Sequence, residues 1–362
     1  MRILHLDEQR GWRGGEQQAS YLARGLVERG HEVFLAGRGS APFLTRDHGV
    51  PMRGVFPAPF LFEFDPWTGS QLAGIVDRYK IDIVHAHTSH THGIACLIKG
   101  LSGTARIVVS RRVDFMPKGS LFNRSKYRRP DRIIAISQRI KDVLMEYGLT
   151  DDHVTVVHSG INPARVDVAP LSRESLGVEP DAYLIGNVAA LVGHKDQRTL
   201  IAAMPAILQG CPKARLLIAG DGDLRAALEG QARSLNLGNA VRFLGYRDDV
   251  PAILKAIDVF VMSSKEEGLG TSVLDAMAAG IPVVATAGGG IPEMVIHEET
   301  GILVPVGDSA GLAAGVLRVV EDRTLAEELT RGATALLHAQ FTVDRMVEGN
   351  LAVYEQLLAE RR

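Results

Sequence analysis

The chain has 362 residues, 46% hydrophobic and 23% charged, with a formal net charge of −2, which is typical of a soluble globular protein with two ordinary domains. Its two cysteines, Cys96 and Cys211, exclude a disulfide framework and a CxxC metal site. No stretch of about 20 residues is apolar throughout, and the N-terminal MRILHL enters a strand-like pattern at once, so we expect no membrane span, no secretory signal and a cytoplasmic location.

Short β-branched runs alternate with longer amphipathic runs from the first residues onward. Buried strands are predicted at 2–6, 32–36, 82–86, 106–110 and 132–136, and a helix at 15–30. This rhythm is typical of a parallel sheet covered by helices on both faces. Residues 1–165 are therefore predicted to form a first Rossmann-like, doubly wound α/β domain.

The same rhythm restarts after a weakly periodic, proline-containing segment at 161–180, which we interpret as an interdomain linker. A second strand set is predicted at 183–191, 214–220, 241–245, 258–262 and 282–286, so that 166–341 form a second doubly wound domain. The final residues, 342–362, are predicted to form one amphipathic helix. In such folds ligands bind outside the carboxyl ends of the strands, so we expect two domains that face each other across a cleft lined by those loops.

The first such loop, DEQRGWRGGEQQ, runs from Asp7 to Gln18 and opens the first long helix at Gly14 and Gly15. Glycines permit a close backbone approach, and a helix N-terminus offers free N–H groups to a phosphate. The spacing is not G-x-G-x-x-G, so a nicotinamide or flavin site is not indicated. A phosphate-binding loop and a plain strand–helix turn both remain open.

The stretch HAHTSHTHG, from His85 to Gly93, contains four histidines directly after a predicted strand. Strand alternation places His85 and His87 on one face, and the other two histidines are expected in the loop. A zinc site is not favoured, because HExxH and a matching carboxylate or cysteine are absent. A neutral imidazole at the strand end that bonds a sugar hydroxyl is the preferred interpretation.

A basic segment lies between residues 99 and 132, where ten lysines and arginines face only two aspartates. Such a segment in a nearly neutral protein indicates an anionic partner, which would be a phosphate, an acidic glycolipid or a membrane surface. A solvated loop and helix face explains the same residues, and the two interpretations stay open. No nucleic-acid partner is expected.

Two loops of the second half contain charged motifs. The D-x-D of AGDGDL follows a strand and opens a helix, so a turn with an N-cap explains it and a metal–nucleotide site is not favoured. In ALVGHKD, Lys195 comes just after a strand, where a lysine is able to neutralise a diphosphate. A plain surface lysine is the alternative.

The most informative stretch is SSKEEGLGTSVLDAMAAG, at 263–280. A buried strand ends at its two serines, a glycine-rich turn follows, and a helix runs from TSVLD to Gly280. Thr271 and Ser272 are expected to cap that helix with their side-chain oxygens, and its free N–H groups suit a nucleotide diphosphate. Glu267 precedes the turn, and Asp275 lies one turn into the helix, where a carboxylate accepts both hydroxyls of a ribose.

These residues resemble the signature of the family 4 retaining glycosyltransferases, which have the GT-B fold. The resemblance is carried by EGLGTSVLDAMAAGIPVVAT and GGGIPEMV, with two acids separated by seven residues. It extends over nearly the whole chain through GWRGGEQQASYLARGLVERGHEV, DIVHAH, DRIIAIS, HSGIN, HKD, AGDGD and FLGYRDDV. FTVDRMVEGNLAVYEQLL resembles the last helix of that family, which crosses back onto the N-terminal domain.

The resemblance implies a role for each matched residue. His87 is expected near the transferred sugar, Lys195 on the diphosphate, and Glu267 on the hydroxyls of the donor sugar, so these three are the predicted catalytic residues. Asp275 corresponds to the acid that binds the ribose. The implied donor-binding residues are Gly14, Gly15, Lys195, Glu267, Gly268, Leu269, Gly270, Thr271, Ser272 and Asp275.

The sequence departs from the family pattern at two positions. The second acid is usually glutamate and is here Asp275, and the arginine expected five residues before the lysine is replaced by Ala190. Arg111 and Arg112, at the end of a predicted strand, are candidates for the missing cation near the diphosphate or the acceptor. The nucleotide base is expected against backbone groups around Tyr246 and Arg247.

The residues and the resemblance together predict a metal-independent glycosyltransferase without a cofactor. It moves a sugar from a nucleotide-diphosphate donor to a hydroxyl of a glycan or glycolipid, with retention, in the synthesis of cell-envelope polysaccharide or lipopolysaccharide. The segment 99–132 would bring it to the inner face of the cell membrane as a peripheral protein. Two alternatives remain: a nucleotide-sugar 2-epimerase of the same fold, and a non-catalytic nucleotide-sugar-binding subunit.

Overall fold

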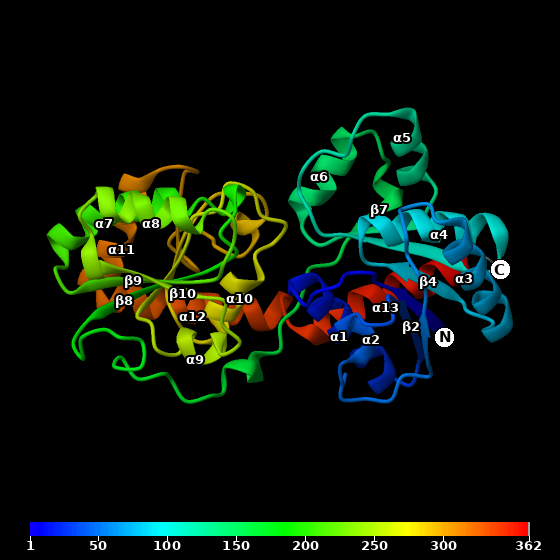
Figure 1. Cartoon of the computed structure of the whole chain (residues 1–362), viewed down its shortest axis with the longest axis horizontal. Coiled ribbons are helices and arrows are strands. Elements are labelled where there is room, and N and C mark those ends of the chain that lie inside the picture. The colour runs from blue at the N-terminus through cyan, green and yellow to red at the C-terminus, as the bar shows by residue number, and fades with distance from the viewer. Residues whose placement is uncertain (361–362) are drawn as a thin grey trace. The chain divides into compact units, whose positions relative to one another are not determined.

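A computed structural model describes residues 1–360, and the chain divides into two compact units that are coloured along the chain in Figure 1. Unit 1 contains Met1–Gly160 together with the C-terminal residues from Val343, and unit 2 contains Ile161–Thr342. Among residues 1–360 no helix is both long enough and apolar enough to cross a bilayer.

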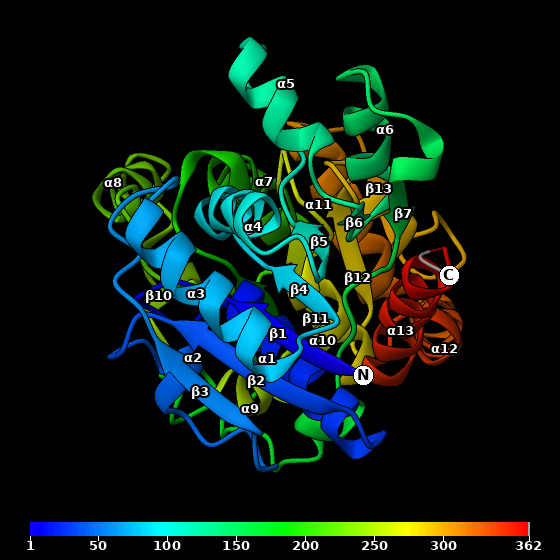
Figure 2. The same cartoon turned by 90° about the vertical axis from the view of Figure 1, so that its right-hand side faces the viewer.

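Unit 1 contains a seven-stranded sheet in which all neighbouring strands are parallel. Its strand order is β3-β2-β1-β4-β5-β6-β7, which Figure 2 shows nearly face-on for β1 to β5. The order reverses between β1 and β4, and such a switch point leaves a crevice at the carboxyl ends of the two strands. The strands are β1 (Arg2–Leu6), β2 (Glu32–Gly37), β3 (Gly54–Pro57), β4 (Ile83–Ala86), β5 (Arg106–Arg111), β6 (Arg132–Ala135) and β7 (Val154–Val156).

Helices cover both faces of this sheet because each crossover between parallel strands carries one. Helices α3 and α4 pack on each other, and α1 packs on α13. Gly25 makes the second contact possible, since a Cβ atom there would lie 2.5 Å from the side chain of Val347. The helices are α1 (Gly14–Glu28), α2 (Pro42–Thr45), α3 (Pro66–Tyr79), α4 (Ser89–Leu101), α5 (Leu121–Arg128), α6 (Gln138–Glu146) and α13 (Val343–Ala359).

Unit 2 contains a six-stranded parallel sheet with the order β10-β9-β8-β11-β12-β13. Its switch point lies between β8 and β11, which pair directly. The strands are β8 (Tyr183–Val188), β9 (Ala214–Ala219), β10 (Val241–Gly245), β11 (Val259–Met262), β12 (Val283–Thr286) and β13 (Ile302–Val304). The helices are α7 (Gln197–Gly210), α8 (Arg225–Ser234), α9 (Val250–Leu254), α10 (Thr271–Ala278), α11 (Ser309–Glu321) and α12 (Arg323–Gln340).

The prediction of two doubly wound parallel-sheet domains is confirmed, and the interpretation of 161–180 as a linker is wrong. That segment belongs to unit 2, where Leu176 is buried and Arg173 forms an ion pair with Asp258 at 3.0 Å. Strands β3, β7 and β13 were not predicted from the sequence. These strands have three or four residues each, which is too short for a clear period-2 pattern.

Candidate active site

Lys195 and Glu267 come together at the switch point of unit 2. Lys195 ends a short 3₁₀ turn (Gly193–Lys195) after β8, and Glu267 lies in the loop after β11. Because β8 and β11 are neighbours, the two loops meet, and the Lys195 Nζ forms an ion pair with Glu267 Oε2. The side chains are 17% and 13% exposed, so both charges are poorly solvated and each depends on the other for compensation.

The loop that carries Glu267 is fixed by its backbone neighbours. The Gly290 N–H donates to the carbonyl of Glu267 at 2.8 Å, and the Lys265 N–H donates to the carbonyl of His194 at 2.8 Å. The Ser264 hydroxyl donates to the Glu267 carboxylate at 3.3 Å. Orientation of this carboxylate therefore depends on residues from three separate loops.

Helix α10 begins directly after this loop, but not as the sequence analysis expected. Thr271 and Ser272 were predicted to cap the helix with their side chains, and this is wrong. The N-cap is Gly270, in the left-handed region at φ 96°, and no side chain caps the helix. The left-handed conformation explains why glycine is required here. The cap residue therefore offers no side-chain acceptor to the N–H groups at the start of α10, which suits an anionic ligand.

Asp275 lies on α10 and has a partner that the sequence analysis missed. Arg165 comes from the 3₁₀ turn Pro163–Val166, and its Nη1 lies 3.3 Å from Asp275 Oδ1. Burial raises the pKa of Asp275, and Arg165 opposes that shift. Since the two positions are 110 residues apart, no local signal in the sequence connects them.

The other predicted residues of unit 2 occupy separate loops. Ala190, where the family pattern has a cation, is exposed. Gly220 packs against that loop so closely that a Cβ atom would lie 1.9 Å from the Ala189 carbonyl oxygen. Tyr246 is 70% exposed, and Arg247 forms an ion pair with Asp249.

Three histidines meet at the switch point of unit 1. His5 on β1 is paired in register with His85 on β4, and His87 follows β4. The His5 Nδ1 and His87 Nε2 atoms lie 2.8 Å apart. Arg112 Nη2 lies 3.4 Å from His87 Nδ1 and donates to it, so His87 carries its proton on Nε2 and donates to His5.

Both ring nitrogens of His85 are hydrogen-bonded to hydroxyl groups. Its Nδ1 lies 2.6 Å from the Tyr354 hydroxyl of α13, and its Nε2 lies 2.8 Å from the Ser110 hydroxyl. Burial holds the pKa of His85 and of His87 well below the usual value, and lowers that of His5 to about 3. All three rings are therefore neutral near pH 7.

The three imidazoles lie within 4.8 Å of one another and have the ligand types of a metal site. Their lone pairs, however, already serve the hydrogen bonds among His5, His87 and Arg112, and those of His85 to its two hydroxyl partners. A metal ion would have to break several of these bonds, so the arrangement fits a hydrogen-bonded relay better than a metal centre. The expectation that the remaining histidines lie in a loop is wrong, because His90 and His92 belong to helix α4.

Arg112 and the glycines of the first loop lie beside this cluster. Helix α1 begins at Gly14, and a Cβ atom on Gly15 would lie 3.7 Å from Cδ of Arg112. Burial lowers the pKa of Arg112 to about 10, so the guanidinium stays charged near neutral pH. Its Nε is buried without a hydrogen-bond partner among residues 1–360.

Asp7, at the carboxyl end of β1, is a buried carboxyl group to which the sequence assigned no role. It has no exposed surface, and its Oδ1 accepts from the Gln9 N–H at 3.0 Å. Burial raises the pKa of Asp7 to about 7, with Glu16 and Glu8 adding to the rise. This carboxyl group therefore titrates in the physiological range.

Replacement of Asp7 by asparagine is expected to flatten the pH dependence of stability. The unfolded carboxyl loses its proton near pH 3.8, whereas the folded one keeps it until about pH 7. Between these values the folded state binds more protons, so the free energy of unfolding falls as pH rises. Between pH 5 and pH 8 the free energy of unfolding of the wild type should fall by about 2–3 kcal/mol more than that of the Asp7→Asn variant. Urea unfolding at both pH values measures this, and parallel profiles would contradict it.

The two adjacent arginines have separate environments. Arg112 lies beside His87, but Arg111 turns into unit 1, where its three nitrogens donate to the Val113 carbonyl, the Tyr127 hydroxyl and the Phe115 carbonyl. Only 8% of Arg111 is exposed. The sequence analysis treated them as one pair, and the structure assigns them different surroundings.

The basic segment 99–132 presents far fewer free charges than its composition suggests. Lys99 and Arg106 both form ion pairs with Asp131, and Lys126 forms one with Glu63. Arg132 is buried and lies near a glutamate of the C-terminal helix end. The strongly exposed cations of the segment are Lys118, Arg124, Arg128 and Arg129.

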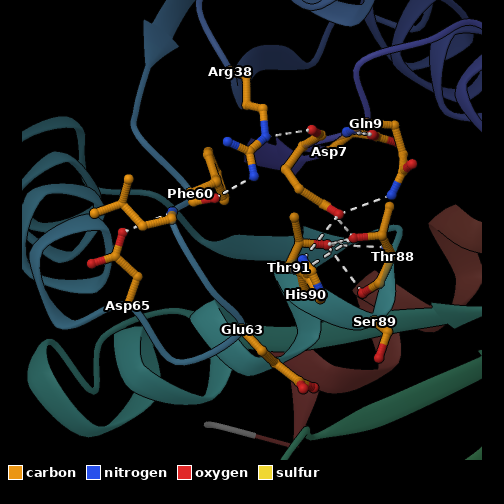
Figure 3. Close-up of polar contacts among 12 residues, drawn as sticks. Asp7, Gln9, Arg38, Phe60, Glu63, Asp65, Thr88, Ser89, His90 and Thr91 are labelled. Carbon is orange, nitrogen blue, oxygen red and sulfur yellow. Dashed lines mark hydrogen bonds and ion pairs between the residues drawn. The ribbon is translucent and has the colours of Figure 1, made fainter.

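Figure 3 shows the polar residues at the N-terminal end of α4, among them Thr88, Ser89 and Thr91. Thr88 and Thr91 form a capping box there, and Glu8 accepts a hydrogen bond from the Thr88 hydroxyl. Arg38 supports the neighbouring loop by donating to the carbonyl oxygens of Glu8 and Phe60. A cavity of about 360 Å³ beside this point is lined by Glu8, Gln9, Arg10, Gly11, Arg13, Glu16, Arg38 and His90.

Sequence comparisons match both units. The family described as "Glycosyltransferase Family 4" matches residues 12–165, and that described as "Glycosyl transferases group 1" matches residues 169–335. An uncharacterized glycosyltransferase of Methanocaldococcus jannaschii is 30% identical over 361 residues, covering 92% of each chain. The N-acetyl-alpha-D-glucosaminyl L-malate synthase of Bacillus anthracis is 26% identical, covering 94% of this chain and 93% of that one.

A relative named for lipopolysaccharide synthesis and a solved structure extend the comparison. The lipopolysaccharide core biosynthesis glycosyltransferase LpsE of Rhizobium meliloti is 31% identical and covers 66% of each chain. The crystal structure of Anabaena Alr3699/HepE in complex with UDP is 24% identical, with a TM-score of 0.85, and covers 98% of this chain and all of that one. This last likeness concerns the fold alone.

Proposed function

Because this chain belongs to glycosyltransferase family 4 and has the GT-B fold, we propose that it moves a sugar from a nucleotide-diphosphate donor to a hydroxyl of a glycan or glycolipid, with retention at the anomeric carbon. In this proposal unit 2 binds the donor and unit 1 binds the acceptor. The relatives named for lipopolysaccharide core synthesis support a role in making cell-envelope polysaccharide or lipopolysaccharide.

The observation that carries the proposal is the arrangement of Lys195, Glu267 and the start of α10 at the switch point of unit 2. An ammonium group and free helix N–H groups stabilise the negative charge that grows on a leaving diphosphate. The Glu267 carboxylate accepts hydrogen bonds from hydroxyls of the donor sugar. Asp275, oriented by Arg165, receives the ribose hydroxyls.

In the proposed reaction the bond between the anomeric carbon and the diphosphate oxygen breaks while the acceptor oxygen attacks from the same face. The departing phosphate takes the proton of the acceptor hydroxyl, so that no separate base is required. His87, held neutral by burial and fixed by His5, would exchange its 3.4 Å contact with Arg112 for a hydroxyl near the reaction centre, which its Nδ1 then accepts. We propose no metal and no cofactor, and turnover should therefore persist in EDTA.

A UDP-sugar is the first donor to test, because the structural neighbour from Anabaena was solved with UDP and with UDP-glucose. We expect the base against the backbone near Tyr246 and Arg247, where the tyrosine is largely exposed. Because Ala190 carries no charge, neutralisation of the diphosphate depends on Lys195 and on the start of α10.

Two other activities compete with this proposal. A nucleotide-sugar 2-epimerase of the same fold would release free nucleotide when no acceptor is present. A non-catalytic binding subunit, suggested by Ala190, would bind a nucleotide sugar without turnover. The three possibilities differ in products, so one assay separates them.

The deciding experiment incubates the protein with a panel of nucleotide sugars, with and without lipid extract and with and without EDTA. The proposal expects nucleoside diphosphate to appear only with an acceptor, together with a product that has retained anomeric configuration. Free nucleotide without acceptor supports the epimerase. Binding without any turnover supports the non-catalytic subunit.

We also propose that unit 1 associates peripherally with the inner face of the cell membrane through a patch that we call the α5 patch. Its apolar members are unusually exposed for a soluble surface, and the ring contact between Phe64 and Phe122, with centroids 4.7 Å apart, joins its two segments. The α5 patch comprises Leu61, Phe62, Trp67, Phe115, Met116, Leu121 and Phe122, with the exposed cations Lys118, Arg124 and Arg128. Exposed aromatic and leucine side chains beside cations fit an anionic lipid surface.

Replacement of Leu121 by serine is expected to weaken binding to anionic vesicles about tenfold, because this side chain is 87% exposed and burying a leucine contributes about 1.5–3 kcal/mol. Cosedimentation with phosphatidylglycerol vesicles measures the loss. Leu235→Ser, at an exposed leucine of unit 2, is the matched control and should bind as the wild type does. Equal binding of both variants, or binding that is insensitive to salt, would contradict the α5 patch as the contact.

A further inference from the structure

Unit 1 contains a second cavity, of about 400 Å³, whose lining is strongly cationic. We call it the Arg111 cavity. Four cations and one carboxylate contribute to its wall: Arg111, Arg112, Lys118, Lys126 and Glu63. Its volume is that of a site for a small molecule or one group of a larger ligand.

The charges of this wall are not balanced within the described chain. Lys126 pairs with Glu63 and donates to the Ser89 carbonyl at 3.0 Å, so its charge is satisfied. Arg111 is bonded only to neutral oxygens, and Asp114 attracts it without a direct contact. Asp7 and Glu16 attract Arg112 in the same way, and no direct ion pair of either arginine is found among residues 1–360. The net charge of the wall is therefore clearly positive.

Burial of a cation that has no directly bonded counter-ion is unfavourable, and a bound anion offsets that cost. Arg111 is 8% exposed. Thr88 and Ser89, at the N-terminal end of the 13-residue helix α4, line the same cavity, and the positive end of the helix dipole adds to the attraction. Figure 3 shows Ser89 beside Glu63 at this helix end.

We propose that the Arg111 cavity binds an oxyanion, a phosphate or a carboxylate, that belongs to the acceptor. This inference rests on the proposed function and specifies it: the acceptor is an anionic molecule whose charged group sits in this cavity. His87 and Arg112 line the cavity as well as the histidine cluster, so an acceptor held by its anion presents a hydroxyl beside His87. Arginine suits this role because its planar guanidinium bonds two oxygens at once.

Calorimetric titration with glycerol phosphate, and with glycerol as its uncharged analogue, tests the cavity directly. Glycerol phosphate should bind saturably and glycerol should not. Lys118→Gln, at an exposed side chain that lines the cavity, should weaken binding about tenfold, the loss of one charge contact of 1.4 kcal/mol. Arg111→Gln should weaken it at least as much, and Arg111→Lys should recover part of the affinity because the charge is kept.

Three controls separate this site from other sources of binding. Arg323→Gln, at a side chain that is 92% exposed on unit 2, should bind glycerol phosphate as the wild type does. Lys195→Ala should also keep this binding, because Lys195 belongs to the donor site of the other unit. Binding lost in Lys195→Ala but kept in both cavity variants would overturn the proposal, as would the absence of saturable binding.

A second arm identifies the source of the anion. If the phosphate belongs to a lipid, Arg111→Gln should reduce binding to phosphatidic acid vesicles more than the Lys195→Ala variant does. If it belongs to a soluble acceptor, glycerol phosphate binding falls in the cavity variants while vesicle binding does not change, and both results support the cavity. Titration of the same samples with UDP, and then with the other nucleoside diphosphates of the panel, tests the donor site. Nucleotide binding without phosphate binding overturns this inference alone, and failure to bind every nucleotide of the panel overturns the proposed function.

Discussion

Replacement of Lys195 by alanine is expected to lower kcat by about 10²–10³-fold, since in the proposed reaction this lysine supplies one preorganised charge to the leaving diphosphate. Glu267→Ala should have an effect of the same order, because the donor sugar loses its carboxylate partner and Lys195 loses its counter-ion. Initial rates with the donor and acceptor found by the nucleotide-sugar panel measure both changes.

The neighbouring residues provide matched controls. Lys265 is 52% exposed and pairs with Asp196 instead of Glu267. Glu266 is exposed, and its backbone N–H, not its side chain, contacts the carbonyl of His194. Lys265→Ala and Glu266→Ala should keep kcat within about twofold, because exposed charges are screened by solvent. Wild-type rates in Lys195→Ala and Glu267→Ala would remove these two residues from the reaction centre.

Replacement of Gly288 by alanine is expected to lower kcat/KM about 10²-fold although the residue contacts no predicted ligand. Its Cβ atom would lie 2.2 Å from the Ser264 carbonyl oxygen and 2.9 Å from that of Lys265. Both contacts are to backbone, so the loop before Glu267 must move. A displacement of about 1 Å in a catalytic group costs about 10²-fold, and the overpacking costs about 1–3 kcal/mol of stability.

Gly74→Ala is the control for this prediction. Gly74 lies inside helix α3 with nothing within 4 Å of the added Cβ, so the variant should keep its kinetics and gain about 0.5–1 kcal/mol of stability. Kinetics and thermal unfolding of both variants separate a shifted loop from a general loss of folding. A Gly288→Ala enzyme with unchanged kcat/KM would show that the Glu267 loop tolerates the shift.

The arrangement of the proposed donor site was largely accessible from the sequence because its parts are local. Glu267, Gly270 and Asp275 belong to one strand–turn–helix unit, and the strand end, the glycines and the helix start are each visible in the order of residues. Side-chain detail within that unit was not accessible. The sequence suggested a cap from Thr271 or Ser272, whereas Gly270 adopts the left-handed cap conformation and no side chain caps the helix.

The histidine cluster shows where local reasoning ends. His85 and His87 were recognised because they share one short motif, but His5 and Tyr354 were missed. His5 and His87 are 82 residues apart, and Tyr354 lies 269 residues from His85. They meet because β1 and β4 are neighbours in the sheet and α13 packs against unit 1. Strand order and helix packing are properties of the whole domain, so no spacing in the sequence predicts these contacts.

The sequence by itself determined the two parallel sheets, the loops at their carboxyl ends and the family of this protein. Hydrophobic periodicity and glycine-rich turns are local patterns that can be recognised in consecutive residues. Only the tertiary structure decided which charges are free. It pairs Lys99 and Arg106 with Asp131, Lys126 with Glu63 and Arg132 with Glu360, gives Asp275 a partner in Arg165, and places Arg111 in the wall of a cavity of unit 1. The physical reason is that a charge is satisfied or left unbalanced by neighbours in space, and the folding of distant segments onto one sheet brings those neighbours together.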